Sequence, residues 1–439
     1  MTDNSTIFAP ITANLNSATI IFRISGPKAL TILELFAVKL QPKPRYAHLV
    51  ELRYQGQLID QALLTFFKAP QSYTGEDVIE LAIHGSSSIY KKIIKILAEH
   101  SDFNYAQPGE FTKRAVHNNK LDLLQAEAIN DLIKAETDKQ ANLALKQLSG
   151  EFSDFYKKLR DDLVKSRALL EAYLDFPEEV IPDNDFAELK NLLDNMLISL
   201  RKKLEDNKAG ELLQQGLQLA IFGPPNSGKS SLINYLAGKD IAIVSEYAGT
   251  TRDIISVKLD IAGYPVIISD TAGIRSTEDQ VEKIGIEKAE QLVKTADLKI
   301  LLLAIDNLES AADYQDFLDQ DSLLVINKND LAQNEQPQIK YDLAISLKAE
   351  QQLDNLLKLL EQKIIEKYQI TEDIILTSGR QRAVIEQVVD VLNVINLNNE
   401  LEIVAEQLRN ISNLLGQLLG IVDIEEVLDK IFREFCIGK

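Results

Sequence analysis

The stretch Gly223-Pro224-Pro225-Asn226-Ser227-Gly228-Lys229-Ser230 fits the pattern Gly-x-x-x-x-Gly-Lys-Ser/Thr that binds nucleotide phosphates. An apolar, strand-like run, Leu217–Phe222, precedes it, and a helix is expected to begin near Lys229. A glycine-rich turn between a strand and a helix lets backbone N–H groups point at phosphate oxygens, aided by the positive end of the helix dipole. The stretch therefore predicts a P-loop domain of the α/β class.

Three hydroxyl and ammonium groups are expected to hold the phosphates and a metal ion. Lys229 is expected to reach the β- and γ-phosphates, and the Ser230 hydroxyl to bind Mg²⁺. A second predicted loop contains Gly249-Thr250-Thr251-Arg252-Asp253. Thr251 of that loop is the natural second hydroxyl ligand of Mg²⁺.

Another phosphate-side segment, Asp270-Thr271-Ala272-Gly273, follows the apolar run Tyr264–Ser269. The Asp270 carboxylate suits an outer-shell role on Mg²⁺, and the Gly273 N–H suits the γ-phosphate. Ras-like GTPases orient the attacking water with a glutamine that directly follows this glycine. Ile274 occupies that position and has no polar atom, so hydrolysis needs another water-positioning group.

Glu282 is a candidate for that group because it is a carboxylate on the stretch beyond this segment. A solvated glutamate at the start of a helix is the alternative reading of the same residue.

The segment Asn327-Lys328-Asn329-Asp330 closes the strand-like run 322–326 and is expected to select the base. A carboxylate such as Asp330 can accept hydrogen bonds from guanine N1–H and the exocyclic amine, which adenine cannot offer. Ile345-Ser346-Leu347-Lys348 is expected to form the loop over the base. Together these features predict GTP as the nucleotide.

Length and composition bound the class of protein. The chain of 439 residues suggests two or three domains, and its one cysteine, Cys436, excludes an internal disulfide framework and indicates a reducing compartment. The N-terminus lacks the layout of a signal peptide and the run 298–305 is too short to span a bilayer, so a cytoplasmic location and no membrane partner are expected. The net charge of −19 argues against non-specific adhesion to nucleic acid but leaves a structured RNA open.

The chain is predicted to be multidomain, of mixed α+β and α/β class. Leu, Ala, Glu, Gln and Lys dominate the second part, where no Gly or Pro interrupts residues 121–149, so long amphipathic helices are expected there. Strand-like runs that alternate with helical segments are expected at 217–222, 254–261, 264–269, 298–305, 322–326 and 342–346. The predicted parts are an N-terminal α+β domain at 1–118, a helical bundle at 119–210 and 377–439, and an inserted Ras-like P-loop GTPase domain at 211–376.

The order of the GTPase motifs resembles that of the Era and TrmE group of translation-factor-related GTPases. Three further stretches narrow the resemblance to the MnmE (TrmE) family of tRNA uridine-5-carboxymethylaminomethyl modification GTPases, and it covers the whole chain. They are Ala69-Pro70-Gln71-Ser72-Tyr73-Thr74-Gly75-Glu76-Asp77, then Pro108-Gly109-Glu110-Phe111-Thr112-Lys113-Arg114-Ala115 with Lys120-Leu121-Asp122-Leu123, and Phe435-Cys436-Ile437-Gly438-Lys439. Two departures are Ser86, where the family has glycine, and Leu347, where alanine is usual, so a contact to guanine O6 would come from the Leu347 backbone N–H.

The resemblance implies a GTPase activated by dimerisation, with K⁺ in place of an arginine finger. Glu282 matches the family's catalytic glutamate. The K⁺ ligands implied are Asn226, Ser245, Tyr247 and Thr250, and the Mg²⁺ ligands are Ser230 and Thr251. The residues expected around GTP are Asn226, Ser227, Gly228, Lys229, Ser230, Ser231, Ser245, Glu246, Tyr247, Ala248, Gly249, Thr250, Thr251, Asp270, Thr271, Ala272, Gly273, Asn327, Lys328, Asn329, Asp330, Ser346, Leu347 and Lys348.

The N-terminal domain is similar to the family's folate-binding and dimerisation unit. Arg23, Glu80, Lys120 and Lys439 match positions around 5-formyl- or 5,10-methylene-tetrahydrofolate, which implies that the chain end folds back onto this site. Without the family, each of these residues reads as a surface charge. Cys436 has two readings, a small buried apolar residue or a covalent role in one-carbon transfer.

The resemblance further implies a homodimer that acts with FAD-containing MnmG, in a heterotetramer or larger complex, on wobble uridine 34 of certain tRNAs. Tetrahydrofolate would supply the one-carbon unit at C5, and glycine or ammonium the amine. Two alternatives stay open: a GTP-dependent, RNA-binding ribosome assembly factor of the Era type, and a folate-binding scaffold whose GTPase is only a switch.

Overall fold

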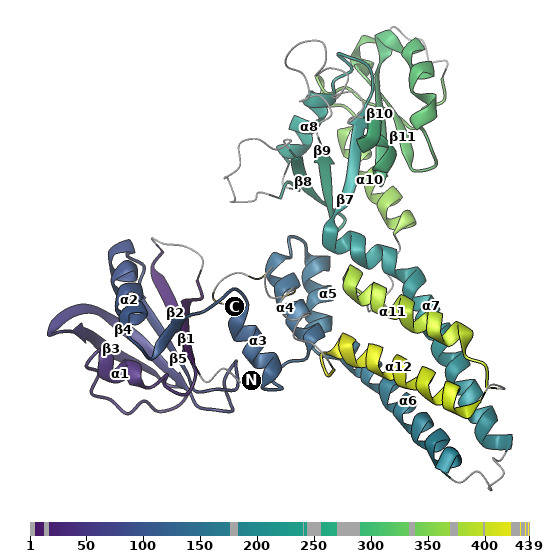
Figure 1. Cartoon of the computed structure of the whole chain (residues 1–439). Coiled ribbons are helices and arrows are strands. Elements are labelled where there is room, and N and C mark those ends of the chain that lie inside the picture. The colour runs from purple at the N-terminus through teal and green to yellow at the C-terminus, as the bar shows by residue number, and fades with distance from the viewer. Residues whose placement is uncertain are drawn as a thin grey trace, which may run out of the picture. The chain divides into compact units, whose positions relative to one another are not determined.

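The chain folds into two compact units, each shown with its helices and strands in Figure 1. This computed structural model describes residues 5–12, 17–175, 183–239, 241–243, 256–269, 290–332, 339–368, 376–397 and 400–422, with Ile431, Phe435 and Gly438. Unit 1 comprises Met1–Asn130, Lys146–Val180 and Leu397–Lys439, and unit 2 comprises Asp131–Leu145 and Ile181–Asn396.

Unit 1 contains a six-stranded sheet with the strand order β3-β4-β5-β2-β1-β6. Only the β1–β6 pair among these neighbours is parallel. Side chains of β4 alternate between buried and more exposed, as expected when one face of a sheet lies on the core. The strands are β1 (Thr6–Pro10), β2 (Thr19–Ser25), β3 (Ala47–Tyr54), β4 (Gln57–Phe67), β5 (Val78–His84) and β6 (Phe103–Tyr105).

Helices α1 (Thr31–Leu35) and α2 (Ser87–Glu99) contribute apolar side chains to the core of this sheet, in which Phe22 and Phe36 are fully buried. Ser86 has an extended backbone and caps α2, because its hydroxyl accepts a hydrogen bond from the Ser88 N–H. The family's glycine is therefore not required there for backbone freedom.

The remaining helices of unit 1 include α3 (Glu110–His117), α6 (Glu151–Asp175) and α12 (Leu401–Leu419). Helices α6 and α12 pack against each other. Phe435, from the end of the chain, packs with Val116 of α3 and with Leu123 at the start of the next helix.

Unit 2 contains the second six-stranded sheet, with the order β12-β11-β10-β7-β9-β8. Its neighbours are parallel apart from β8, which is antiparallel to β9. Every residue of β10 is buried, as expected for a central strand covered on both faces. The strands are β7 (Leu217–Phe222), β8 (Ser256–Ile261), β9 (Tyr264–Ser269), β10 (Leu298–Ala304), β11 (Ser322–Asn327) and β12 (Leu343–Ala344).

The helices described in unit 2 besides those within residues 131–145 include α7 and α11, which pack against each other. These helices are α7 (Asp183–Gln215), α8 (Lys229–Ala237), α10 (Leu353–Lys367) and α11 (Gly379–Val394), with short 3₁₀ turns at Ile305–Asn307, Glu309–Phe317 and Asn329–Leu331. The predicted fold class is confirmed: an α+β N-terminal part, a helical part and an inserted P-loop α/β domain.

The helical stretch 121–149 is broken where neither glycine nor proline marks a break. Helix α4 (Leu123–Lys134) ends and α5 (Asp138–Leu148) begins around Thr137. The Gln140 side-chain oxygen accepts hydrogen bonds from the Glu136 and Thr137 N–H groups at 2.7 and 3.0 Å, so a side chain closes the turn. This break, residues 135–140, is called the α4–α5 elbow below.

Candidate functional site

The phosphate-binding stretch lies between β7 and α8, at the point where the strand order of the second sheet reverses. Ligands of open α/β sheets bind at this point, beside the carboxyl ends of the strands. Gly223 has φ +139°, and a Cβ there would lie 2.2 Å from the Leu302 carbonyl oxygen of β10. Gly228 has φ +104°, and its Cβ would lie 2.3 Å from the Asn327 amide nitrogen. Only glycine fits these two positions.

Within this loop, the side chains present a cation and hydroxyls on one short segment. The Lys229 ammonium donates to the carbonyl oxygens of Gly223 and Pro224 at 2.9 and 2.8 Å, so it lies across the loop. Ser230 and Ser231 are exposed on the first turn of α8. Over the part of the chain that the structure describes, the Ser227 hydroxyl is one of six buried side-chain N and O atoms with no hydrogen-bond partner. These groups fit a phosphate chain with a bound metal ion.

A single buried side chain joins the phosphate loop to the base-selecting motif. The Asn327 amide nitrogen donates to the Ser227 carbonyl oxygen at 2.8 Å, and its oxygen accepts from the Leu347 N–H at 3.1 Å. The Leu347 N–H, expected to meet guanine O6, is thus bonded to Asn327 in this structure. The Ser346 hydroxyl is hydrogen-bonded to the Asp330 carboxylate at 2.5 Å and orients it. Asn327, Asp330 and the 345–348 loop therefore form one rigid corner.

Several of the residues singled out in the sequence fall outside the described residues. They are Ser245, Glu246, Tyr247, Ala248, Gly249, Thr250, Thr251, Asp270, Thr271, Ala272, Gly273, Glu282, Cys436 and Lys439.

In the N-terminal sheet, the structure pairs two of the residues expected around folate. Arg23 on β2 and Glu80 on β5 face each other across the strands, with Nη2 and Oε1 2.8 Å apart. The Arg23 guanidinium also lies 4.7 Å from the Tyr73 ring centroid and 5.6 Å from that of Phe111. A charged pair flanked by aromatic rings, 15% and 25% exposed, fits a flat ligand with amine and carbonyl edges.

The aliphatic stem of Lys120 lies beside Gly75, in the loop that carries Tyr73, since a Cβ on Gly75 would be 3.2 Å from its Cγ. Tyr73 donates to or accepts from the Thr112 hydroxyl at 2.8 Å. Burial raises the pKa of the Tyr73 phenol, although the Thr112 hydrogen bond and the Arg23 charge oppose it. Tyr73 therefore stays neutral at ordinary pH and adds a polar aromatic wall that the sequence did not assign.

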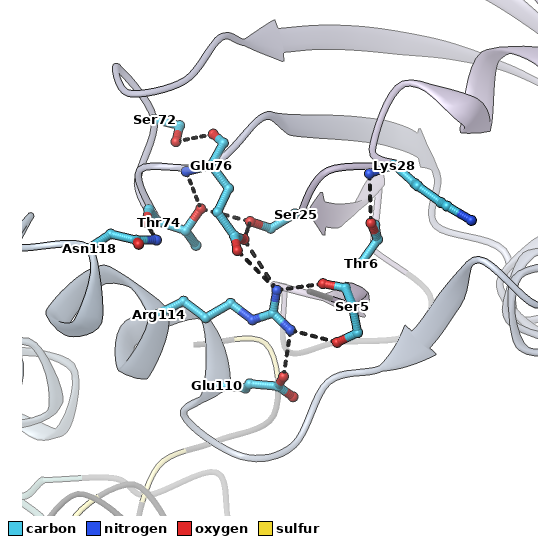
Figure 2. Close-up of polar contacts among 10 residues, drawn as sticks. All are labelled: Ser5, Thr6, Ser25, Lys28, Ser72, Thr74, Glu76, Glu110, Arg114 and Asn118. Atoms are coloured by element: carbon cyan, nitrogen blue, oxygen red, sulfur yellow. Dashed lines mark hydrogen bonds and ion pairs between the residues drawn. The ribbon is translucent and has the colours of Figure 1, made fainter. Parts of the chain in front are cut away.

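Figure 2 shows the network that holds the loop carrying Tyr73. Arg114 of α3 pairs with Glu76 at 3.1 Å and with Glu110 at 3.0 Å, and donates to the Ser5 carbonyl oxygen at 2.7 Å. Further hydrogen bonds of the loop join Ser25 to Glu76 and Thr74, Asn118 to the Thr74 carbonyl, and, within the loop, Ser72 to the Glu76 carbonyl. The two stretches that resemble the family, 69–77 and 108–115, are thus joined by one ion-pair network. Their separation in the sequence hides this connection.

The sheet order, the phosphate loop at its switch point and the Asn-Lys-x-Asp corner define a P-loop GTPase. The family described as "MnmE helical domain" matches residues 123–436, and "GTP-binding protein TrmE N-terminus" matches residues 6–120. The chain belongs to the MnmE family of tRNA modification GTPases, and it is a GTP hydrolase that acts in tRNA modification.

Relatives match along the full length. The chain is 42% identical to the tRNA modification GTPase MnmE of Rickettsia typhi and 43% identical to that of Rickettsia akari, in both cases over 99% of this chain and 100% of the relative. Among solved structures, the G domain of the T. maritima FeoB iron transporter is 23% identical, covering 34% of this chain and 97% of that chain with a TM-score of 0.24. Within the described residues, no helix is long and apolar enough to cross a membrane.

Proposed function

We propose that this GTPase is activated by K⁺-dependent dimerisation of its GTPase domains and acts with MnmG on tRNA. In this proposal the pair installs the carboxymethylaminomethyl or aminomethyl group on C5 of wobble uridine 34, with a tetrahydrofolate one-carbon unit. The proposal that the nucleotide is GTP rests on the Asn327 side-chain amide, which is hydrogen-bonded both to the phosphate loop and to the loop expected over guanine. The protein is proposed to be cytoplasmic and homodimeric. Its proposed domains are residues 1–118, residues 119–210 with 377–439, and residues 211–376.

The residues of the chain have defined tasks in hydrolysis. Lys229 and the loop N–H groups hold the phosphates, Ser230 and Thr251 bind Mg²⁺, and Asp330 holds guanine. Glu282 positions water in place of the glutamine absent at Ile274. Asn226, Ser245, Tyr247 and Thr250 offer oxygen ligands to K⁺, whose charge offsets the charge that develops between the β- and γ-phosphates.

The N-terminal site supplies the folate part of the proposal. Glu80 offers paired acceptor oxygens to an aminopyrimidine edge, Arg23 and Lys120 offer donors, and Tyr73 and Phe111 provide apolar surfaces beside the guanidinium. Lys439 is proposed to join them, and Gly438 lies against Pro10 of β1, which supports a chain end that returns to this sheet. The Era-type alternative is not favoured, because the full-length relatives are tRNA modification GTPases.

The experiment measures GTP hydrolysis by the purified chain in KCl and in NaCl. We expect hydrolysis about a hundredfold faster in KCl, the size of effect that one well-placed charge-stabilising group provides. Glu282→Ala should lower the rate about a hundredfold or more while leaving GTP affinity unchanged. Equal rates in the two salts would refute the K⁺ mechanism, and unchanged turnover of the variant would refute the role of Glu282. Mass spectrometry of tRNA nucleosides from a complemented deletion strain tests the modification itself and separates it from a GTPase switch on a folate-binding scaffold.

A further inference from the structure

The α4–α5 elbow lies, by its packing, in the same compact unit as the GTPase sheet, together with α7 and α11. Residues Asp131–Leu145 cluster in the compact unit that contains β7 to β12, although the sequence places them in the helical domain. This placement brings the elbow against the β8–β9 hairpin, through contacts that are all within unit 2.

Two charged contacts join the elbow to the hairpin. The Lys258 ammonium of β8 donates to both carboxylate oxygens of Glu136, at 2.7 and 2.9 Å. The Lys139 ammonium lies 4.2 Å from the ring centroid of Tyr264, the first residue of β9. The stem of Lys139 covers Gly263 in the hairpin turn, where φ is +83° and a Cβ would come within 2.8 Å of Lys139 Cγ.

The elbow is also hydrogen-bonded to helix α7. Gln140 is 4% exposed, and its amide nitrogen donates to the Leu213 carbonyl oxygen at 2.9 Å. Leu213 lies in the last turn of α7, which leads directly into β7 and the phosphate loop. The Tyr264 hydroxyl donates to the Tyr368 carbonyl oxygen at 2.5 Å, at the end of α10. The turn end of the hairpin is thus tied to the segments through which the chain enters and leaves the GTPase domain.

The other end of the hairpin carries the predicted nucleotide ligands. Ser256 and Ser269 pair at that end, and the six residue pairs from there to the turn run without a bulge. The segment with Thr251 directly precedes β8, and the segment with Asp270 directly follows β9. A movement of the groups that contact the γ-phosphate and its metal ion would therefore displace both strands.

We infer that the α4–α5 elbow transmits the conformational difference between the GDP-bound and GTP-bound states from the β8–β9 hairpin to helices α4 and α5. The contacts that transmit it are the Glu136–Lys258 ion pair and the Lys139 contact with Tyr264. The inference rests on the proposed nucleotide ligands in the segments that flank the hairpin. It makes Glu136, Lys139 and Lys258 positioning residues that couple hydrolysis to tRNA modification, and assigns them no part in hydrolysis itself.

The test compares hydrolysis and modification in full-length variants. Glu136→Gln removes the ion pair, Glu136→Lys with Lys258→Glu reverses it, and Glu171→Gln removes a comparable pair, Arg167 with Glu171 on α6 at 2.9 Å. We expect Glu136→Gln to hydrolyse GTP within about twofold of the parent while modified uridine in tRNA falls about fivefold or more, the usual lower bound of coupling between sites. The reversed pair should restore modification, and Glu171→Gln should change neither quantity.

Hydrogen exchange gives a second measurement, whose dependence on the bound nucleotide would not change if the ion pair only stabilised the fold. Amides of residues 131–145 should exchange at different rates with GDP and with a non-hydrolysable GTP analogue in the parent, and at equal rates in Glu136→Gln. The inference is overturned if these rates are equal in the parent while residues 223–230 gain protection from the analogue. It is also overturned if hydrolysis and modification fall together, or if neither falls. An absence of protection at residues 223–230 would overturn the proposed nucleotide site as well.

Discussion

Arg114 shows how one buried residue organises the loop that carries Tyr73. Its side chain is 9% exposed, and its guanidinium is paired with the carboxylates of Glu76 and Glu110. The Glu76 carboxylate in turn accepts from the Ser25 hydroxyl at 2.6 Å. Because each charge is held by several partners, the network fixes the loop that places Tyr73 against Arg23.

Removing this guanidinium should therefore affect both stability and folate binding. Arg114→Met leaves two carboxylates without their cation, so the free energy of unfolding should fall by about 3–5 kcal/mol, as when one partner of a buried pair is lost. Tetrahydrofolate affinity should fall with it. Urea unfolding and calorimetric binding measure the two effects.

The matched control is Arg53→Met, whose pair with Glu51 is 44% and 49% exposed. It should cost less than about 1 kcal/mol, because solvent screens such pairs. Equal losses in the two variants would show that the Arg114 network does not stabilise the domain.

At the scale of elements, a buried cation of strand β10 pairs with a carboxylate in the connection between β10 and β11. Lys299 of β10 is 7% exposed, and its ammonium lies 2.6 Å from the Asp319 carboxylate. Burial by itself would raise the pKa of Asp319, but hydrogen bonds from Lys299, Ser322 and the Asp321 N–H hold it below its usual value of 3.8. A carboxyl with a lowered pKa in the folded state stabilises the fold above its unfolded-state pKa and loses that contribution as pH falls through the folded-state value.

Asp319→Asn should therefore destabilise the GTPase domain at neutral pH by about 1–2 kcal/mol, a discounted figure because Asp319 is 44% exposed. The difference from the parent should persist down to pH 4 and shrink below it, as the parent's carboxyl is protonated. Thermal melting between pH 7 and 3.5 measures this. A difference that grows as pH falls would contradict the sign of the argument.

The ends of elements bounded by glycine were predicted from the sequence, and a break closed by side chains was not. Strands β7 and β9 have the expected ends, because Gly216 and Gly223 flank the first and Gly263 precedes the second. The break between α4 and α5 was missed, although Thr137 and Gln140 have the spacing of a capping box, in which each side chain accepts a hydrogen bond from the other residue's N–H. In the same way, sequence patterns marked Arg23 and Glu80 through the family but not their ion pair.

At the scale of the whole molecule, the end of the chain returns to the N-terminal part. Phe435 is 5% exposed and packs with Val116, Leu123 and Ala126. A Cβ on Gly438 would lie 2.1 Å from the Pro10 carbonyl oxygen. The proposed folate ligand Lys439 follows directly, so this packing is what would place it.

Phe435→Ala should loosen that return and weaken tetrahydrofolate binding about tenfold or more, while GTP hydrolysis stays unchanged. Loss of a buried aromatic ring costs about 3 kcal/mol or more when the site cannot collapse. Folate titration and a hydrolysis assay on the same preparation check both parts. Ile198→Ala, at a 66% exposed position on α7, is the control and should change neither. A parallel fall in hydrolysis would show a general loss of fold.

The elbow has a practical consequence for work on excised domains. A fragment cut at residues 211 and 376 keeps Tyr264, which is 1% exposed in the whole chain, but loses the Lys139 side chain beside its ring. Lys258 would lose Glu136 and the Leu213 carbonyl would lose Gln140. Hydrogen-exchange rates and stability measured on such a fragment would describe a hairpin that has lost these contacts, even where its hydrolysis rate is unchanged. A fusion that restores residues 131–145 to the fragment would be the closer surrogate for the native domain.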